Sequence, residues 1–376
     1  MKLLILDQFS DPGGAQQALV ELLPAIRDRG WDAVVGMPGD GPLFGQIGAL
    51  GFETAKIDCG PYRSVRKSPA DALRFLMGTP RLTRQVRLLA KHAQADLVYV
   101  NGPRLLPAVV GLEAPVVFHS HSYVSGGVSR RMAGEALRRV DASVVAACRF
   151  VAEPWARFVP RERVTVIYNG VASPTRACER RSGVPFTRIG CIGRIAPEKG
   201  QLEFLRAAAI LHRALPECRF AICGAPLFSD ARARRYAAQV RADAAGLPVE
   251  FTGWVGDIGA VLAGLDLLLA PSTGPEATTR VILEAYAAGV PAIAFPSGGI
   301  PEVADGLPGM LADSAEEMAA LAIEFLTGPQ ERRARLREAA REQWRRRFRL
   351  ERYHQEVLAT IERAARGSAE RALTNT

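Results

Sequence analysis

The chain has 376 residues, of which 48% are hydrophobic and 23% are charged. This length suits two domains better than one, and the charged fraction is ordinary for a globular protein. The formal net charge of +9 indicates anionic partners, such as a phosphorylated substrate, a lipid headgroup surface or nucleic acid, without choosing among them.

The first residues read "MKLLILDQFSDPGG" and predict a β-strand at residues 3–6, because the apolar run is too short for a signal peptide and ends at Asp7. No apolar run in the chain reaches the roughly 18–20 residues that span a bilayer. The six cysteines form no C-x-x-C pair, so we expect no zinc site and no disulfide framework. We therefore expect a cytoplasmic protein.

The loop after this first strand carries Gly13 and Gly14 directly before a helical pattern. Glycines and free N–H groups at a helix start suit a diphosphate, but glycines also make an ordinary tight turn. The sequence leaves both interpretations open. The spacing matches neither G-x-x-x-x-G-K-[ST] nor G-x-G-x-x-G, which argues against an ordinary ATPase or dinucleotide dehydrogenase.

Residues 62–93 carry eight basic residues against one acidic residue, Asp71, with apolar residues interleaved. This segment is either an amphipathic surface that touches an anionic membrane or an ordinary solvated helix face. No nucleic-acid recognition motif accompanies the charge, so we expect no nucleic-acid partner.

Apolar strand patterns alternate with helical patterns along the whole chain, which predicts doubly wound α/β domains with buried parallel sheets. The expected strands are residues 3–6, 33–37, 97–100, 116–119, 143–147, 188–192, 219–223, 249–252, 265–270 and 292–295. The alternation pauses once, in the Pro-, Gly- and Ser-rich segment 166–186, which is typical of a linker.

We therefore predict two Rossmann-like domains that face each other across a cleft. The first covers residues 1–170 and the second residues 171–366, with a terminal helix that packs back on the first domain and a frayed tail at 367–376. Ligands of such sheets bind at the carboxyl ends of the strands, so the functional residues should lie in the loops there.

Two further loops of the second domain carry charged residues suited to a ligand. In "CIGRIAPEKGQLEFLRAA", Arg194 and Lys199 precede a helix and form a predicted anion site, unless they are solvated loop charges. In "GPEATTRVILEAYAAGVP", Glu276 lies in a loop and Glu284 lies in a mostly apolar helix that Thr278 and Thr279 are expected to cap. A carboxylate there needs partners, and a polyhydroxy ligand supplies them.

These elements together resemble the retaining family 4 glycosyltransferases, which have the GT-B fold. The resemblance covers nearly the whole chain, and its most specific parts are the E-x7-E element and the R-x4-K pair. It implies that the chain moves a sugar from a nucleotide diphosphate sugar to an acceptor hydroxyl with retention, in glycan, lipid-linked saccharide or glycosylated metabolite synthesis. No metal or other cofactor is expected, since two cations replace a metal on the diphosphate.

The resemblance also implies roles for particular residues. Arg194 and Lys199 would hold the diphosphate, together with the backbone at Gly13 and Gly14. Glu276 would contact the sugar and Glu284 the ribose, while the loop at Gly224 and Pro226 would flank the base. His121 would lie by the transferred sugar, and His119 and Asn101 are expected on the acceptor side. The full set of expected catalytic residues is His121, Arg194, Lys199 and Glu276.

Thr278 and Thr279 are also expected to contact the donor. The sequence departs from the family at these two residues, where an aromatic residue and a glycine are usual, and this leaves the donor sugar open. The acceptor, the linkage and the choice between uridine and guanosine donors are open as well. Two other functions fit the same fold, a nucleotide-sugar epimerase and a non-catalytic nucleotide-sugar-binding protein. If the acceptor is lipid-linked, the protein would lie on the inner face of the membrane.

Overall fold

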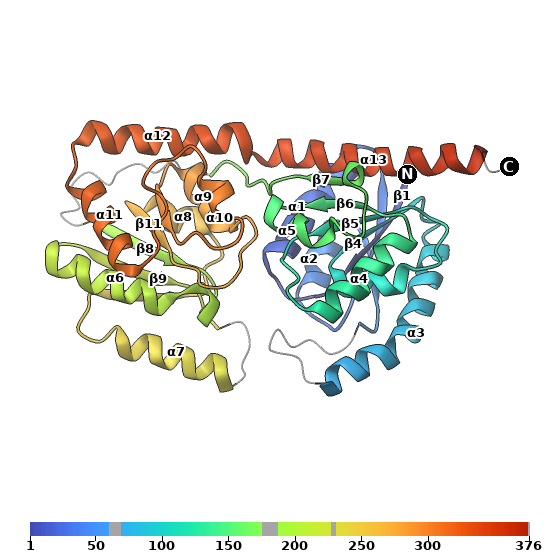
Figure 1. Cartoon of the computed structure of the whole chain (residues 1–376), viewed down its shortest axis with the longest axis horizontal. Helices are drawn as coiled ribbons and strands as arrows, with labels where there is room; N and C mark the ends of the chain where they lie inside the picture. The colour runs from blue at the N-terminus through green and yellow to red at the C-terminus, as the bar shows by residue number, and fades with distance from the viewer. Residues whose placement is uncertain (60–68, 175–186, 227–230, 375–376) are drawn as a thin grey trace. The chain divides into compact units, whose positions relative to one another are not determined.

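A computed structural model of the whole chain describes residues 1–59, 69–174, 187–226 and 231–374 (Figure 1). The chain divides into two compact units. The first unit consists of Met1–Tyr168 and Tyr353–Thr376, and the second of Asn169–Arg352. None of the helices in the described residues combines the length and apolar character needed to cross a membrane.

The first unit is built on a parallel sheet with the strand order β3-β2-β1-β4-β5-β6-β7 among the described residues. Its strands are β1 (Lys2–Asp7), β2 (Asp32–Met37), β3 (Glu53–Lys56), β4 (Leu97–Asn101), β5 (Val116–Ser120), β6 (Ser143–Ala146) and β7 (Val164–Val166). Its helices are α1 (Gly14–Asp28), α2 (Leu43–Ala49), α3 (Pro69–His92), η1 (Pro103–Val109), α4 (Gly127–Arg139), α5 (Arg149–Ala152), η2 (Glu153–Trp155) and η3 (Arg161–Arg163).

The second unit is built on a parallel sheet with the order β10-β9-β8-β11-β12 in the part of the chain that the structure describes. Its strands are β8 (Arg188–Ile192), β9 (Arg219–Cys223), β10 (Val249–Gly253), β11 (Leu267–Ala270) and β12 (Ala292–Ala294). Its helices are η4 (Pro197–Lys199), α6 (Gln201–Ala214), α7 (Ala231–Asp243), α8 (Ile258–Ala263), α9 (Arg280–Ala288), α10 (Ile300–Ala304), α11 (Ala315–Thr327) and α12 (Gln330–Arg347).

The final helix, α13 (Leu350–Thr374), belongs to the first unit from Tyr353 onward. Its backbone is helical to Thr374, which includes most of the segment 367–376 for which the sequence predicts a frayed tail. Residues 375–376 lie outside the described residues.

The first sheet is buried on both faces, as its apolar strands predicted. Successive side chains of a strand point to opposite faces. Leu4 and Leu6 of β1 pack with α3, η1 and α4, while Leu3 and Ile5 point the other way and are also fully buried. The prediction of two doubly wound α/β units is confirmed, and each predicted strand is present to within two residues at either end.

Strands β3 and β7 were not predicted. Both are short strands at the edges of the first sheet, and their residues are exposed or half-buried rather than buried. An edge strand packs on fewer neighbours than a central strand, so it need not carry the continuous apolar run that identifies the others.

The strand order places the candidate residues. In each sheet the order reverses between two neighbours, β1 and β4 in the first unit and β8 and β11 in the second, and such a switch point leaves a crevice at the carboxyl ends of the strands. Asp7 and Asn101 end the two strands of the first switch point. Arg194 follows β8, and Glu276 follows β11, at the second.

Candidate functional site

The loop that carries Arg194 and Lys199 is held by a buried glutamine. Gln201, the first residue of α6, is fully buried, and its side-chain nitrogen donates to the Arg194 carbonyl oxygen at 2.9 Å. Its side-chain oxygen accepts from the Ala196 backbone N–H at 3.3 Å. Both cations therefore lie on a short turn whose backbone is fixed to the helix that follows.

The same turn packs directly against the loop after β11. Gly200 has a φ of +70°, and a Cβ at this position would lie 1.7 Å from the Pro271 carbonyl oxygen. The Glu198 carbonyl oxygen accepts from the backbone N–H groups of Thr273 and Gly274, both at 3.1 Å. Only glycine allows this approach, and the approach brings the Glu276 loop to Lys199.

Lys199 and Glu276 form an ion pair in consequence. The Lys199 Nζ lies 2.6 Å from the Glu276 Oε1, and the two side chains are 27% and 15% exposed. The sequence predicted one residue for the diphosphate and the other for the sugar. The structure brings these two side chains together at the switch point of the second sheet.

Two more ion pairs flank this one. The Arg194 Nη2 lies 2.5 Å from the Glu198 Oε1, and the Arg280 Nε donates to the Glu284 Oε1 at 2.8 Å. Glu198 and Arg280 were not predicted as site residues. Arg280 and Glu284 stand four residues apart on α9, within reach along one helical turn, so the spacing could have indicated that pair. Arg194 lies in the loop before η4, so no helical spacing predicts its pairing with Glu198.

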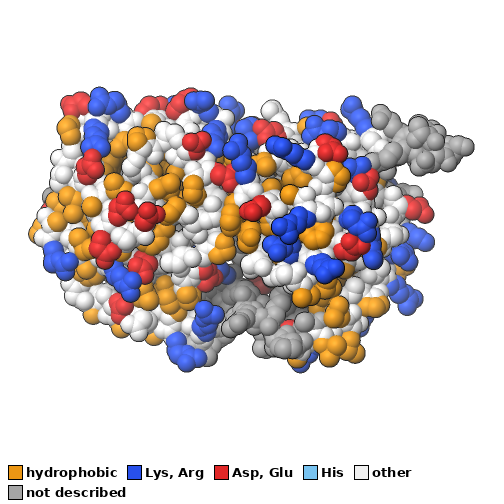
Figure 2. Space-filling view, viewed as in Figure 1, with side chains coloured by type: hydrophobic (Ala, Val, Ile, Leu, Met, Phe, Trp, Pro, Cys, Tyr) orange, Lys and Arg blue, Asp and Glu red, His pale blue; other side chains and the backbone are white. Residues whose placement is uncertain are grey.

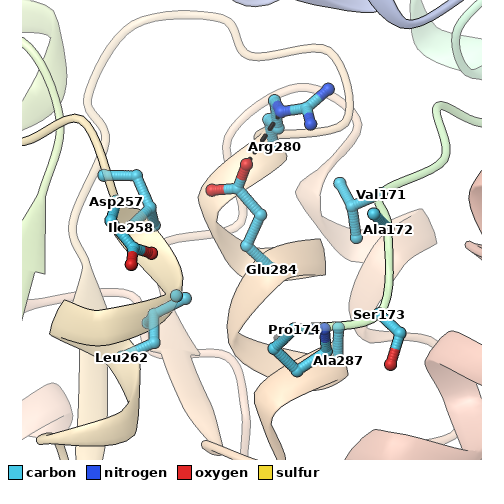
Figure 3. Close-up of a pocket in the computed structure, with 11 residues that line it drawn as sticks. Val171, Ala172, Ser173, Pro174, Asp257, Ile258, Leu262, Arg280, Glu284 and Ala287 are labelled. Carbon is cyan, nitrogen blue, oxygen red and sulfur yellow. Dashed lines mark hydrogen bonds and ion pairs between the residues drawn. The ribbon is translucent and has the colours of Figure 1, made fainter. Parts of the chain in front are cut away.

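Glu284 faces a cavity of about 170 Å³ in the second unit. Figure 3 shows the Glu284 side chain rising from α9 toward Arg280, with the segment Val171–Pro174 on one side and residues of α8 and its N-cap on the other. Trp344 of α12 holds the first residue of that segment, because its Nε1 donates to the Val171 carbonyl oxygen at 3.1 Å. The neighbours Leu283 and Ala285 are fully buried, so the helix is apolar except at the cavity.

The predicted capping of α9 by threonine side chains is wrong. Thr279 is the N-cap residue, but its side chain makes no capping hydrogen bond. A capping side chain requires an extended backbone, whereas Thr279 has φ 35° and ψ 80°. Thr278 instead accepts a hydrogen bond from the Asn169 Nδ2 at 2.8 Å.

The loop at Gly224 and Pro226 lies against the Arg194 loop. Gly224 has a φ of +146°, and a Cβ there would lie 2.0 Å from the Gly193 carbonyl oxygen. The Ile195 N–H donates to the Ala225 carbonyl oxygen at 3.1 Å. Pro226 is exposed, and residues 227–230 lie outside the described residues.

At the first unit's switch point, a buried acid joins three segments. The Asp7 Oδ1 accepts from the Phe9 N–H and the Gln16 Nε2, both at 2.8 Å, and its Oδ2 accepts from the Asn101 Nδ2 at 2.5 Å. Burial raises the pKa of this carboxyl from 3.8 to about 6. Asp7 was not predicted as a site residue, although an acid at the end of an apolar strand is visible in the sequence.

The predicted diphosphate-binding glycines, Gly13 and Gly14, lie in the chain just after Asp7. Gly13 is the N-cap of α1 and Gly14 its first residue, and a Cβ on Gly14 would meet nothing within 4 Å. Gln16, in the first turn of α1, ties this helix start to Asp7. The backbone at the glycines is thereby fixed to the ends of β1 and β4.

The two histidines lie on one side of β5 and its continuation, as strand periodicity requires. Their rings are stacked with centroids 3.7 Å apart. His119 is fully buried and its Nδ1 is hydrogen-bonded to the Tyr99 hydroxyl, while His121 is half-buried. Burial lowers the pKa of His119 well below its usual range and that of His121 to about 3, so both imidazoles are neutral at physiological pH.

Comparison with known families accounts for both units. The model described as Glycosyltransferase Family 4 matches residues 12–173, and the model described as Glycosyl transferases group 1 matches residues 187–328. The chain belongs to the family 4 glycosyltransferases, and its two units are the Rossmann-like domains of the GT-B fold. The resemblance seen in the sequence is confirmed at this level.

Particular relatives narrow the comparison. The chain is 31% identical over 183 residues to a GDP-mannose-dependent α-(1-6)-phosphatidylinositol dimannoside mannosyltransferase of Mycobacterium tuberculosis. This match covers 47% of the chain and 42% of that protein. A GDP-mannose-dependent monoacylated α-(1-6)-phosphatidylinositol monomannoside mannosyltransferase of Corynebacterium glutamicum is 30% identical, covering 43% of the chain and 45% of that protein. The matches thus span less than half the length of these curated relatives.

A solved structure matches over a greater length. The structure of Anabaena HepE in complex with UDP has a TM-score of 0.81 and 26% identity, and the match covers 96% of this chain and 100% of that one.

Proposed function

We propose that this protein is a retaining glycosyltransferase that moves a sugar from a nucleotide diphosphate sugar to an acceptor hydroxyl. The observation that carries the proposal is the contact between Lys199 and Glu276. A cation suited to a phosphate and an acid suited to sugar hydroxyls lie side by side at a switch point, as the junction between diphosphate and sugar requires. Relatives that use GDP-mannose and a similar structure that holds UDP support a nucleotide donor.

In the proposed mechanism, Arg194 and Lys199 stabilise the charge that develops on the departing diphosphate. Such stabilisation is typically worth a few kcal/mol per donor in a site that excludes water. The acceptor oxygen attacks the anomeric carbon on the face that the leaving group departs from, the bond from this carbon to the phosphate oxygen breaks, and the diphosphate takes the acceptor proton. This route requires no covalent sugar intermediate.

The remaining assignments follow from the side chains available. Glu284 accepts hydrogen bonds from the ribose hydroxyls, and Glu276 accepts them from the sugar. In the first unit, His121 serves as a neutral hydrogen-bonding group, because its lowered pKa of about 3 keeps it uncharged. The Gly13 and Gly14 backbone is assigned to the diphosphate.

We propose that the reaction needs no metal, since two cations already serve the diphosphate. The test is the rate of transfer in excess chelator, with added Mg²⁺ or Mn²⁺ as the comparison. Full activity in chelator is the expected result, and loss of activity that a divalent metal restores would contradict it.

We further propose a lipid-linked acceptor and a peripheral contact with the cytoplasmic face of an anionic membrane. Both curated relatives are named for phosphatidylinositol mannosides. Helix α3 exposes Leu73, Leu76, Met77 and Leu88, which at 100° per residue fall on one face together with Arg84, Arg87 and Lys91. The opposite face buries Leu82 and Val86. Figure 2 shows hydrophobic and basic side chains next to one another over α3.

The first part of the predicted membrane segment, residues 62–68, lies outside the described residues. The test of the surface on α3 is therefore made with Met77→Glu and Arg84→Glu, measured by binding to liposomes with anionic or neutral headgroups. Both variants should weaken binding to anionic liposomes, while Arg206→Glu, which changes an exposed arginine of the second unit, should not. Equal binding of the wild type to both liposomes would contradict the proposal.

A single assay separates the proposed function from its two alternatives. Incubation with UDP-glucose or GDP-mannose labelled in the sugar should give label on an added hydroxyl acceptor, with the anomeric configuration retained. Isomerised nucleotide sugar without transfer would indicate an epimerase. Binding without any reaction would indicate a non-catalytic protein.

A further inference from the structure

Thr279 has an unusual backbone and an unsatisfied hydroxyl. Its φ of 35° lies in the left-handed region, which a β-branched residue rarely adopts. The residue is only 8% exposed, and its Oγ1 has no hydrogen-bond partner among the described residues. A strained residue with a buried unpaired hydroxyl is unfavourable for folding, so its presence indicates a functional role.

A second buried polar atom without a partner belongs to Asn169, whose side chain is hydrogen-bonded to the residue before Thr279. The Asn169 Nδ2 donates to the Oγ1 of Thr278, the residue directly before Thr279. The other half of the amide, the Asn169 Oδ1, is buried and has no hydrogen-bond partner within the described parts of the chain. One hydroxyl and one carbonyl oxygen therefore remain to be satisfied beside the same two-residue segment.

The chemistry of these two atoms selects the ligand. A threonine hydroxyl both donates and accepts, whereas an amide oxygen only accepts. A phosphate has no proton to give the Asn169 oxygen at neutral pH, except on a monoester near its second pKa. A sugar hydroxyl both accepts and donates, so it matches the pair. The segment also begins two residues after Glu276, the acid assigned to the sugar.

We propose that the Thr279 hydroxyl and the Asn169 carbonyl oxygen bind a hydroxyl of the donor sugar and determine which sugar is accepted. This proposal rests on the proposed function and extends it. The strain at Thr279 is then retained because glycine, which would relieve it, has no hydroxyl to offer.

The test compares three substitutions at this position with the wild type. Thr279→Val removes the hydroxyl at nearly constant shape, and Thr279→Ser keeps it. With whichever of UDP-glucose or GDP-mannose the wild type uses, the valine variant should raise KM about tenfold and the serine variant less than threefold. The Kd for the free nucleotide diphosphate, UDP or GDP, should change less than twofold in both.

Thr279→Gly is the control for a loss of donor affinity that is caused by damage to the fold. It should raise the Tm, because glycine adopts the left-handed backbone without strain, and still raise KM as the valine variant does. A variant that is more stable yet binds the donor sugar more weakly cannot be explained by damage to the fold.

Monodeoxy donors complete the test as a double-mutant cycle. For the one donor that lacks the contacted hydroxyl, wild type and Thr279→Val should have equal KM values. The proposal is overturned if the valine variant weakens UDP or GDP as much as the nucleotide sugar, if the serine variant loses as much as the valine variant, or if no deoxy donor removes the difference. Failure of the proposed function would be distinct, because the wild type itself would then transfer no sugar.

Discussion

Replacement of Lys199 by alanine should lower turnover without unfolding the protein. The Lys199 Nζ lies 2.6 Å from Glu276, and in the proposed reaction it also contacts the departing diphosphate. A hydrogen bond to a charged group is worth about 1.5–3 kcal/mol. If this contact forms in the transition state, its loss lowers kcat by about 10- to 150-fold.

The effect on folding should be much smaller. The two side chains are 27% and 15% exposed, so water partly solvates the Glu276 carboxylate once its partner is removed. We expect a loss of about 1 kcal/mol in the free energy of unfolding, between the values for surface and fully buried pairs. Denaturation in urea therefore separates a catalytic effect from a structural one.

The assay is initial-rate transfer at saturating donor, with two matched variants. Lys199→Arg keeps a positive charge and should retain more activity than the alanine variant. Arg206→Ala removes an exposed cation of α6 that pairs with Glu203, and should leave kcat unchanged. A kcat for Lys199→Ala within twofold of wild type would refute the role assigned to the lysine.

Three further predictions test the surroundings of the site. Glu198→Gln removes the carboxylate that competes with the ligand for Arg194, and this half-exposed ion pair is worth about 0.5–1 kcal/mol. The Kd for UDP or GDP, measured by calorimetry, should therefore fall two- to fivefold, and weaker binding would contradict this. Gly200→Ala should lower the Tm far more than Gly306→Ala. Both glycines have a positive φ, but of the two only Gly200 would place a Cβ against backbone atoms, those of Pro271. Equal losses of Tm would show that the close approach of Gly200 to Pro271 is unimportant. Burial raises the pKa of Asp7 from 3.8 to about 6, so the folded protein binds this proton more tightly and the free energy of unfolding should fall by up to about 3 kcal/mol as the pH rises from 4 to 6. Urea denaturation of Asp7→Asn should lack this pH dependence. If the wild type and the variant gave parallel curves of stability against pH, the raised pKa would be excluded.

The central strands could be predicted from the sequence because burial on both faces leaves a continuous apolar run. Residues 3–6 and 97–100 are examples, and both became strands. The edge strands β3 and β7 carry no such run, since water reaches part of their surface. What the sequence reveals about a strand is therefore its burial rather than its pairing.

The location of the site could also be predicted, because its residues follow strands and a doubly wound sheet gathers the ends of its strands. The contacts within the site could not. The meeting of Lys199 and Glu276 depends on Gly200 lying against Pro271, two segments about 70 residues apart that no local pattern connects. Asp7 was missed because an acid that ends a strand is equally typical of an exposed turn.

The three ion pairs of the second unit have a consequence for ligand exchange. Each side chain assigned to the donor already holds a counterion from the protein itself, Glu198 on Arg194, Glu276 on Lys199 and Arg280 on Glu284. A ligand that offers only negative charge, such as inorganic pyrophosphate, would draw Lys199 away from Glu276 and offer that carboxylate no hydrogen-bond donor in return. A nucleotide sugar brings anionic oxygens for the cations and hydroxyl donors for Glu276 and Glu284 in one molecule, so discrimination against the smaller anion is a property of the unliganded protein.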